Sequence, residues 1–199
     1  MKKLMGKTEF EKFLDSARPT EIGFDGASYI IHVGKKLYVA EPPFPPKEIF
    51  PPRFTLLREH LDSKPKIVVV LVHLGEYAIG LFQGTELAVY KTGKHSIRGR
   101  TRKGGSSSAR YARVRARQRT EFLEGVSFAI EILLSSQAVD HIFLGGSGLT
   151  AKALVKTCPY LKRNEKKVSL RTVRARHADF ETLKASIDDA WSFRVTKIP

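Results

Sequence analysis

The stretch KIVVVLVHLGEYAIGLFQGTELAVYKTGK, residues 66–94, decides the fold of this chain. It holds three runs of β-branched and aromatic residues, separated by the short turns Gly75-Glu76 and Gly84-Thr85. Connections of this length join antiparallel strands. The stretch therefore predicts a three-stranded antiparallel meander.

Helices and strands are expected to alternate after the meander. Apolar residues recur at helical spacing from Phe122 to Leu134, which predicts a long helix from about Ser107 to about Ser136. The elements expected next are a buried strand at 140–148, a helix at 149–161, a strand at 167–175 and a last helix at 178–191. This order predicts an α/β fold, a mixed-sheet sandwich of the RNase H-like kind in which αβαβα follows the meander.

The residues before the meander predict a small N-terminal extension. Its expected elements are a helix at 7–17, a hairpin of strands at 29–33 and 36–40, and a proline-rich linker at 41–54. The linker holds six of the ten prolines, a composition that excludes helix and central strand. It is either a packed strap or a ligand for a partner module. We therefore expect an extension at 1–55, and the α/β domain at 56–199, which begins with a short helix.

The composition points to a polyanionic partner. The 199 residues carry a net charge of +15, and 42% of them are apolar, so the chain can bury a core. The longest apolar run, Ile67 to Val72, is far below the roughly 18 residues of a membrane span, and no signal peptide is evident. With Cys158 as the single cysteine, we expect a cytoplasmic protein with no disulfide, metal or other cofactor.

Positive charge is concentrated just after the meander. Within 26 residues the chain has ten basic side chains and no acid: Lys94, Arg98, Arg100, Arg102, Lys103, Arg110, Arg113, Arg115, Arg117 and Arg119. A helix that is charged on several sides cannot lie on a core, so its first third should project beyond the sheet. The cluster is either a solvated face or an RNA-binding surface, and its single sign favours RNA.

The tip of this basic stretch has a composition suited to anions. Gly104 and Gly105 leave backbone N–H groups unshielded, and the serines that follow can cap the helix. The start of a helix with free N–H groups can hold an anion or a developing oxyanion. His95 is the one side chain near the tip suited to act as a titratable base, and it is either a phosphate or solvent contact or a general base.

The sequence GGSSSARYARVR, residues 104–115, resembles the peptide-releasing domain of archaeal and eukaryotic class-one release factors, whose loop is GGQSxxRFxRxR. The matching positions are Gly104, Gly105, Ser107, Arg110, Tyr111, Arg113 and Arg115. The resemblance covers roughly Lys66 to the end of the chain, and the sequence is more similar still to stand-alone bacterial Vms1-like release factors. Those proteins free nascent chains from peptidyl-tRNA on stalled ribosomes or large subunits.

The resemblance implies a catalytic loop made of Gly104, Gly105, Ser106 and Ser107, without stop-codon recognition. Ser106 stands where the family has glutamine, so the backbone N–H is kept and the glutamine side chain, which would help to place water, is lost. The implied function is ribosome-associated peptidyl-tRNA hydrolysis. The implied partners are large-subunit rRNA and peptidyl-tRNA, not DNA. The alternative is a non-catalytic RNA- or ribosome-binding module.

Two weaker patterns lie further along the chain. Gly146 to Ala151, GSGLTA, is either a glycine-rich turn from strand to helix or a weak dinucleotide-binding signature. A second basic group comprises residues 162–167 with Arg171, Arg174 and Arg176. It either extends the RNA footprint or forms a solvated face.

Overall fold

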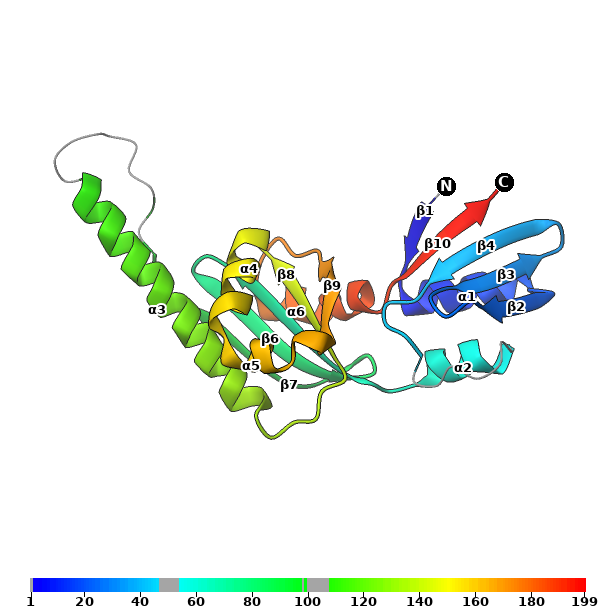
Figure 1. Ribbon diagram of the computed structural model, residues 1–199, viewed down its shortest axis with the longest axis horizontal. Helices are drawn as coiled ribbons and strands as arrows, with labels where there is room; N and C mark the ends of the chain where they lie inside the picture. The colour runs from blue at the N-terminus through cyan, green and yellow to red at the C-terminus, as the bar shows by residue number, and fades with distance from the viewer. Residues whose placement is uncertain (1, 47–53, 98, 100–107) are drawn as a thin grey trace. The chain divides into compact units, whose positions relative to one another are not determined.

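The structure is a computed structural model that describes residues 2–46, 54–97, 99 and 108–199. Contacts between residues divide the chain into two compact units (Figure 1). The N-terminal unit comprises Met1–Lys64 together with Ile187–Pro199, and the central unit comprises Pro65–Ser186. Each unit contains one five-stranded sheet.

The sheet of the central unit is mixed, as expected. Its strands are β5 (Lys66–His73), β6 (Glu76–Gln83), β7 (Glu86–Lys94), β8 (His141–Gly146) and β9 (Val168–Val173), in the order β7-β6-β5-β8-β9. The meander is confirmed, because β5 pairs antiparallel with β6 and β6 antiparallel with β7. Strands β8 and β9 continue the sheet in parallel with β5. Consequently β5, β7, β8 and β9 all run in one direction and end at the same edge of the sheet.

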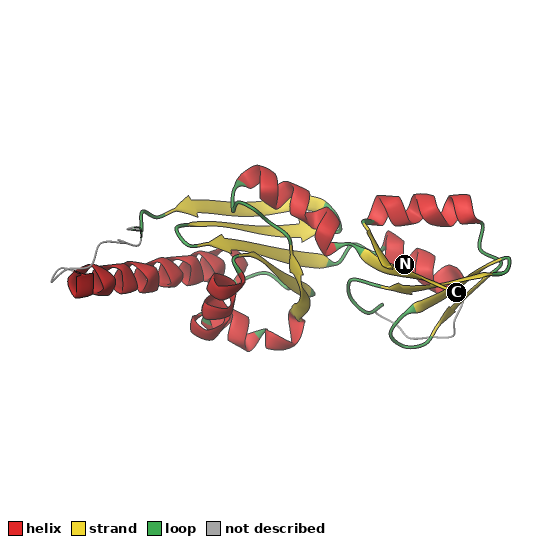
Figure 2. Ribbon diagram, turned by 90° about the horizontal axis from the view of Figure 1, so that it is seen from above, coloured by secondary structure: helices red, strands yellow, loops and turns green. Residues whose placement is uncertain are grey.

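Helices cover both faces of this sheet (Figure 2). They are α3 (Ser108–Leu134), α4 (Gly148–Thr157), α5 (Pro159–Arg163) and α6 (Phe180–Ala190), with the short 3-10 turn η1 (Glu165–Lys167) before β9. Helices α3, α4 and α5 lie on one face and α6 on the other. The single helix expected at 149–161 is wrong, because Pro159 disfavours helical backbone at Cys158, which is extended at φ −83° and ψ 114°.

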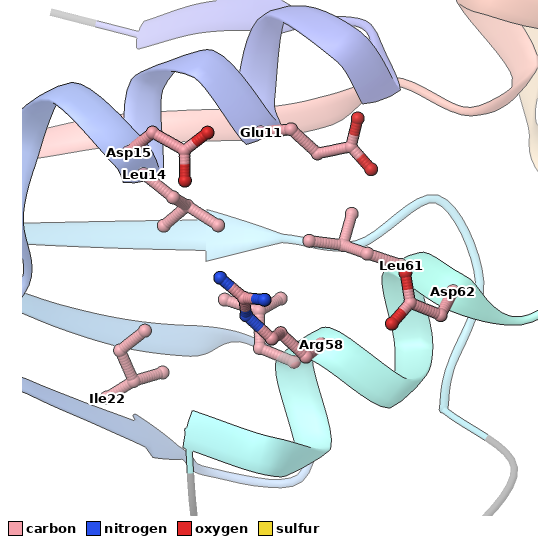
Figure 3. Close-up of a pocket in the computed structure, with 8 residues that line it drawn as sticks. Glu11, Leu14, Asp15, Ile22, Arg58, Leu61 and Asp62 are labelled. Carbon is pink, nitrogen blue, oxygen red and sulfur yellow. The ribbon is translucent and has the colours of Figure 1, made fainter.

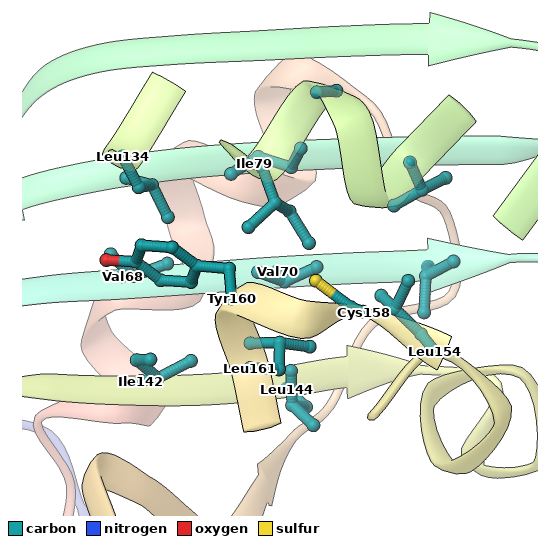
Figure 4. Close-up of a cluster of buried hydrophobic side chains, with 14 of the residues drawn as sticks. Val68, Val70, Ile79, Leu134, Ile142, Leu144, Leu154, Cys158, Tyr160 and Leu161 are labelled. Carbon is teal, nitrogen blue, oxygen red and sulfur yellow. The ribbon is translucent and has the colours of Figure 1, made fainter. Parts of the chain in front are cut away.

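The core of the central unit explains why β5 is so apolar. Val68 and Val70 point into a cluster with α3, α4 and α5 (Figure 4). The alternate residues Ile67 and Val69 are fully buried as well, and they belong to the opposite face, where α6 packs. A strand buried on both faces needs a continuous apolar run, which is the pattern of residues 67–72.

The N-terminal unit is an antiparallel sheet with helices on its core face. Its strands are β1 (Lys2–Met5), β2 (Glu21–Phe24), β3 (Tyr29–Val33), β4 (Lys36–Glu41) and β10 (Phe193–Ile198), in the order β1-β10-β4-β3-β2. The helices α1 (Lys7–Ala17) and α2 (Phe54–Asp62) contribute Phe10 and Leu57 to one core. The Phe10 ring stacks on that of Phe193, with 4.1 Å between the ring centroids.

The structure divides the chain differently from the expected 1–55 and 56–199. Strand β10 pairs with β1 on one side and with β4 on the other, so the C-terminal strand completes the N-terminal sheet. Helix α2 also belongs to the N-terminal unit, because Leu57 and Leu61 are buried in its core. The N-terminal sheet therefore joins segments from both ends of the sequence, so no single boundary along the chain divides the two units.

Candidate nucleic-acid interface

Helix α3 changes character along its length. None of its residues before Phe122 is buried, whereas one stripe of the remainder is: Phe122, Leu123, Val126, Ala129, Ile130 and Leu134. Figure 1 shows the first turns of α3 extending past the sheet of its own unit. The expected projection of the arginine-bearing turns is therefore confirmed. In the described ranges no helix, α3 included, has the length and hydropathy needed to cross a membrane.

The arginines of these projecting turns form what we call the arginine helix, Arg110 to Arg119. Its members Arg110, Arg113, Arg117 and Arg119 are exposed and Arg115 is half-buried. Arg117 Nε lies 3.4 Å from Glu121 Oε1, one turn further along. With the part of the chain that the structure describes, the other four arginines form no ion pair. Their positive charge is therefore available to a polyanion.

The expected tip lies outside the described residues. Gly104, Gly105, Ser106 and Ser107 fall there, together with Arg98, Arg100, Arg102 and Lys103. The described structure ends on one side just after β7 and resumes at Ser108, the first residue of α3.

His95 lies at the root of this segment, directly after β7. Its backbone N–H donates a hydrogen bond to the Gly75 carbonyl, 2.7 Å away, which ties the end of β7 to the turn between β5 and β6. Its exposed side chain lies beside α3, with 6.3 Å between the ring centroids of His95 and Phe122. The segment that carries the tip thus leaves from a fixed point of the sheet edge, next to the place where α3 begins to pack.

The first glycine of GSGLTA, Gly146, is required by packing. A Cβ on Gly146 would lie 2.4 Å from the Val72 carbonyl oxygen, and φ at Gly146 is +87°, a value that side chains rarely adopt. The Ser147 hydroxyl caps α4 by accepting a hydrogen bond from the Thr150 N–H at 3.5 Å. The close approach of β8 to β5 therefore explains the pattern as a strand-to-helix turn.

The second basic group does not form one surface. Lys166 and Lys167 precede β9, whereas Arg174 and Arg176 follow it. A six-residue strand is about 20 Å long, so the two pairs lie at opposite ends of β9. Treating these basic residues as one group overlooked the distance between the two pairs, although the strand expected at 167–175 already implied it. Arg174 and Arg176 therefore lie at the edge of the sheet past which the arginine helix projects.

A pocket of the N-terminal unit has the opposite chemistry (Figure 3). It lies between α1 and α2, with a floor of leucine and isoleucine side chains and carboxylates from Glu11, Asp15 and Asp62 at its rim. Figure 3 shows the Arg58 side chain reaching from α2 toward α1. With three carboxylates and one guanidinium, this rim repels phosphates.

The fold and the basic helix together define a release-factor-like domain of the translation machinery. The crystal structure of the archaeal translation termination factor aRF1 matches with a TM-score of 0.50 and 20% sequence identity, covering 82% of this chain and 47% of that one. A family model described as the Actinobacteria/chloroflexi VLRF1 release factor matches residues 65–196. The chain belongs to this release factor family, and the expected resemblance is confirmed.

Further similarities are found to one curated protein and to one solved structure. Peptide chain release factor subunit 1 of Thermococcus sibiricus is 31% identical over 104 residues, which make up 50% of this chain and 25% of that protein. The structure of the Vms1 mitochondrial localization core covers 97% of this chain with 12% identity and a TM-score of 0.47. The chain thus matches about a quarter of the length of its curated relative.

Proposed function

We propose that this protein is a cytoplasmic, ribosome-associated peptidyl-tRNA hydrolase that releases nascent chains from stalled ribosomes or large subunits, without recognising a stop codon. Membership of a release factor family supports the general role. In the reaction, water adds to the ester carbonyl, the bond to the ribose oxygen breaks, and peptide and tRNA separate.

The proposal gives the parts of the central unit separate roles. The arginine helix holds rRNA and the acceptor end of tRNA through their phosphates, which makes binding dependent on salt. Gly104, Gly105, Ser106 and Ser107 bring backbone N–H groups to the ester, where they stabilise the developing oxyanion. Arg98, Arg100, Arg102 and Lys103 add positive charge on the other side of the tip.

One observation carries this proposal. Helix α3 holds five arginines in its exposed first turns, has no acid before Glu121, and begins directly after the release-factor-like tip. A solvated helix face mixes both signs of charge, whereas a surface of one sign is relieved by a polyanion. In a release factor family, the polyanion that fits is ribosomal and transfer RNA.

The test is peptide release from purified large subunits that carry peptidyl-tRNA. Wild-type protein should release the peptide, and Gly105→Ala or Ser106→Pro should abolish release while leaving subunit binding intact, because Pro removes the backbone donor. The double variant R110Q/R113Q should lose binding and release together. Release that survives Gly105→Ala and Ser106→Pro would exclude the proposed catalytic tip.

A matched control removes the same charge elsewhere. Lys35, in the turn between β3 and β4, and Lys36, the first residue of β4, are exposed on the N-terminal unit. The variant K35Q/K36Q loses two positive charges, as R110Q/R113Q does, and should keep release within about twofold of wild type because surface substitutions away from a site have small effects. Equal losses in both variants would contradict a specific role of the arginine helix.

The Ser106 substitution favours a second candidate, a non-catalytic module that binds the ribosome or its RNA. The same assay separates the two functions. Binding to the loaded subunit without release at any protein concentration would establish the module. Release in the Ser106→Gln variant but not in wild type would show that the lost glutamine is the reason.

A further inference from the structure

A groove lies where the parallel strands β8 and β9 end. From the β8 side it is lined by Gly145, Gly146 and Gly148, and from the β9 side by residues that include Thr172, Arg174 and Arg176. We call it the strand-end groove. A Cβ on Gly148 would meet nothing within 4 Å, so the backbone at the start of α4 is open to an approaching group. The groove thus has glycine backbone on the β8 side, which we call the glycine wall, and two guanidinium groups on the β9 side.

The strand-end groove and the arginine helix lie at the same edge of one sheet. Strands β7, β8 and β9 run in the same direction, as established by the pairing of the central sheet. The segment from β7 to α3 leaves from this edge, and the groove opens at it. One hydrogen bond at this edge joins the end of β5 to the segment after β9, because His73 Nε2 lies 3.1 Å from the Ala175 carbonyl oxygen.

The charge of this edge favours an anion. Arg174 and Arg176 are exposed. Among the described residues that line the groove there is no acid. The carboxylates of Glu76 and Asp179, which are not among them, accept hydrogen bonds from the Ala178 N–H at 3.1 Å and from the Thr182 N–H at 2.8 Å. These acids anchor the start of α6. Arg174 and Arg176 are the charged side chains among the described residues that line the groove.

We propose that the strand-end groove is a second RNA contact, in which Arg174 and Arg176 hold a backbone phosphate of the RNA that the arginine helix binds. The inference rests on the proposed function, which supplies that RNA. Two contacts at one edge fix the direction in which the RNA crosses the domain, and a single helix does not. The N–H groups at the start of α4 add to the attraction.

The chemistry specifies the backbone of RNA as the ligand. Guanidinium groups bind phosphate oxygens through two parallel hydrogen bonds. The glycine wall offers no side chain that could distinguish one base from another. The groove therefore binds without sequence preference, and each phosphate contact should steepen the salt dependence of binding.

The test measures binding of a short RNA hairpin with a single-stranded 3′ extension by fluorescence anisotropy at several salt concentrations. For R174Q/R176Q we expect about tenfold weaker binding and a slope of log K against log salt that is shallower by about 1 to 2, because each lost phosphate contact contributes about 0.7 to 0.9. Changing the sequence of the extension should leave the difference unchanged.

The control variant K166Q/K167Q removes the same charge from the other end of β9, where both lysines are exposed. It should bind within about twofold of wild type and keep the salt slope. Equally weakened RNA binding in both double variants would show a general effect of charge and contradict a specific contact in the strand-end groove. Unchanged binding by R174Q/R176Q would also overturn it.

A second pair of variants addresses the groove without touching its arginines. Gly148→Asp places a carboxylate at the first turn of α4, where it stabilises the helix and opposes a phosphate, and Gly148→Asn is its neutral match. Only Gly148→Asp should weaken binding. If R110Q/R113Q loses RNA binding while R174Q/R176Q and Gly148→Asp bind as wild type does, the strand-end groove is not an RNA contact. The proposed function is unaffected by that result. No RNA binding by wild type would remove both.

Discussion

Gly146 and Gly148 lie two residues apart, and they differ in whether a side chain would fit. At Gly146 a methyl group meets the Val72 carbonyl oxygen and φ is +87°, whereas at Gly148 space is open. Gly146→Ala should lower the free energy of unfolding by about 2 kcal/mol or more, because the left-handed region alone costs about 1–2 kcal/mol. Urea unfolding followed by circular dichroism measures the change.

The matched substitution is Gly148→Ala. It adds a methyl group at a helical position with no neighbour, and it restricts the unfolded chain, so stability should stay equal or rise by up to about 1 kcal/mol. Equal losses in the two variants would contradict the packing of β8 against β5.

Glu41 links the strands β4, β10 and β1 by charge. Its carboxylate accepts a hydrogen bond from Arg194 Nη1 at 2.8 Å and lies 3.4 Å from Lys2 Nζ. Partial burial raises the pKa of Glu41, but Arg194 and Lys2 outweigh it and hold the pKa below its usual value. A carboxyl whose pKa is lowered on folding stabilises the fold above its unfolded pKa, and the contribution disappears as pH falls through the folded value.

The expected result is a stability difference between wild type and Glu41→Gln that depends on pH. It should be less than about 1 kcal/mol near neutral pH, because the pair is partly exposed, and it should shrink in acid. Chemical unfolding between about pH 3 and pH 7 measures it. A difference that grows as pH falls would contradict the direction of the pKa change.

At the scale of elements, α3 offers a pair of phenylalanines with opposite roles. Phe122 is buried in the core of the central unit, whereas Phe128 is 67% exposed. Phe122→Ala should cost about 3–5 kcal/mol of unfolding free energy, and Phe128→Ala should stay within about 0.5 kcal/mol of wild type. Thermal or urea unfolding distinguishes them, and similar losses would show that α3 packs on another face.

Long periodic elements could be predicted from the sequence. The meander and α3 extend over many residues with one regular apolar pattern, and their bounds agree closely with the structure. The strands β1 and β2 were missed because they are only four residues long. The strand β10 was missed because its partners, β1 and β4, are distant in sequence. The break between α4 and α5 carried a local signal, Pro159, that the helical pattern obscured.

The candidate site was predictable in part for the same reason. Exposure of the arginine helix follows from its charge pattern and was predicted. The strand-end groove was not, because Arg174 and Arg176 join it only through the directions of β8 and β9 in the sheet. Charge is visible in a sequence, but the edge at which it gathers depends on topology.

At the scale of the whole molecule, the two units should differ in their dependence on the last strand. Removing residues 193–199 takes β10 from between β1 and β4 and takes Phe193 from the core. We expect rapid proteolysis within residues 1–64 and a resistant fragment near 65–186. Limited proteolysis with mass spectrometry tests this. A truncated chain cleaved no faster than wild type within residues 1–64 would contradict the central place of β10.

The position of β10 also sets the order of events when the protein is made. Lys3 pairs with Val195, so the entire central unit is synthesised between two neighbouring residues of one sheet. Contacts across such a separation form slowly, because a long loop must close first. The N-terminal unit is therefore completed after the central unit, although residues 1–64 are synthesised before it. Until β10 is added, Phe193 does not cover Phe10 of α1.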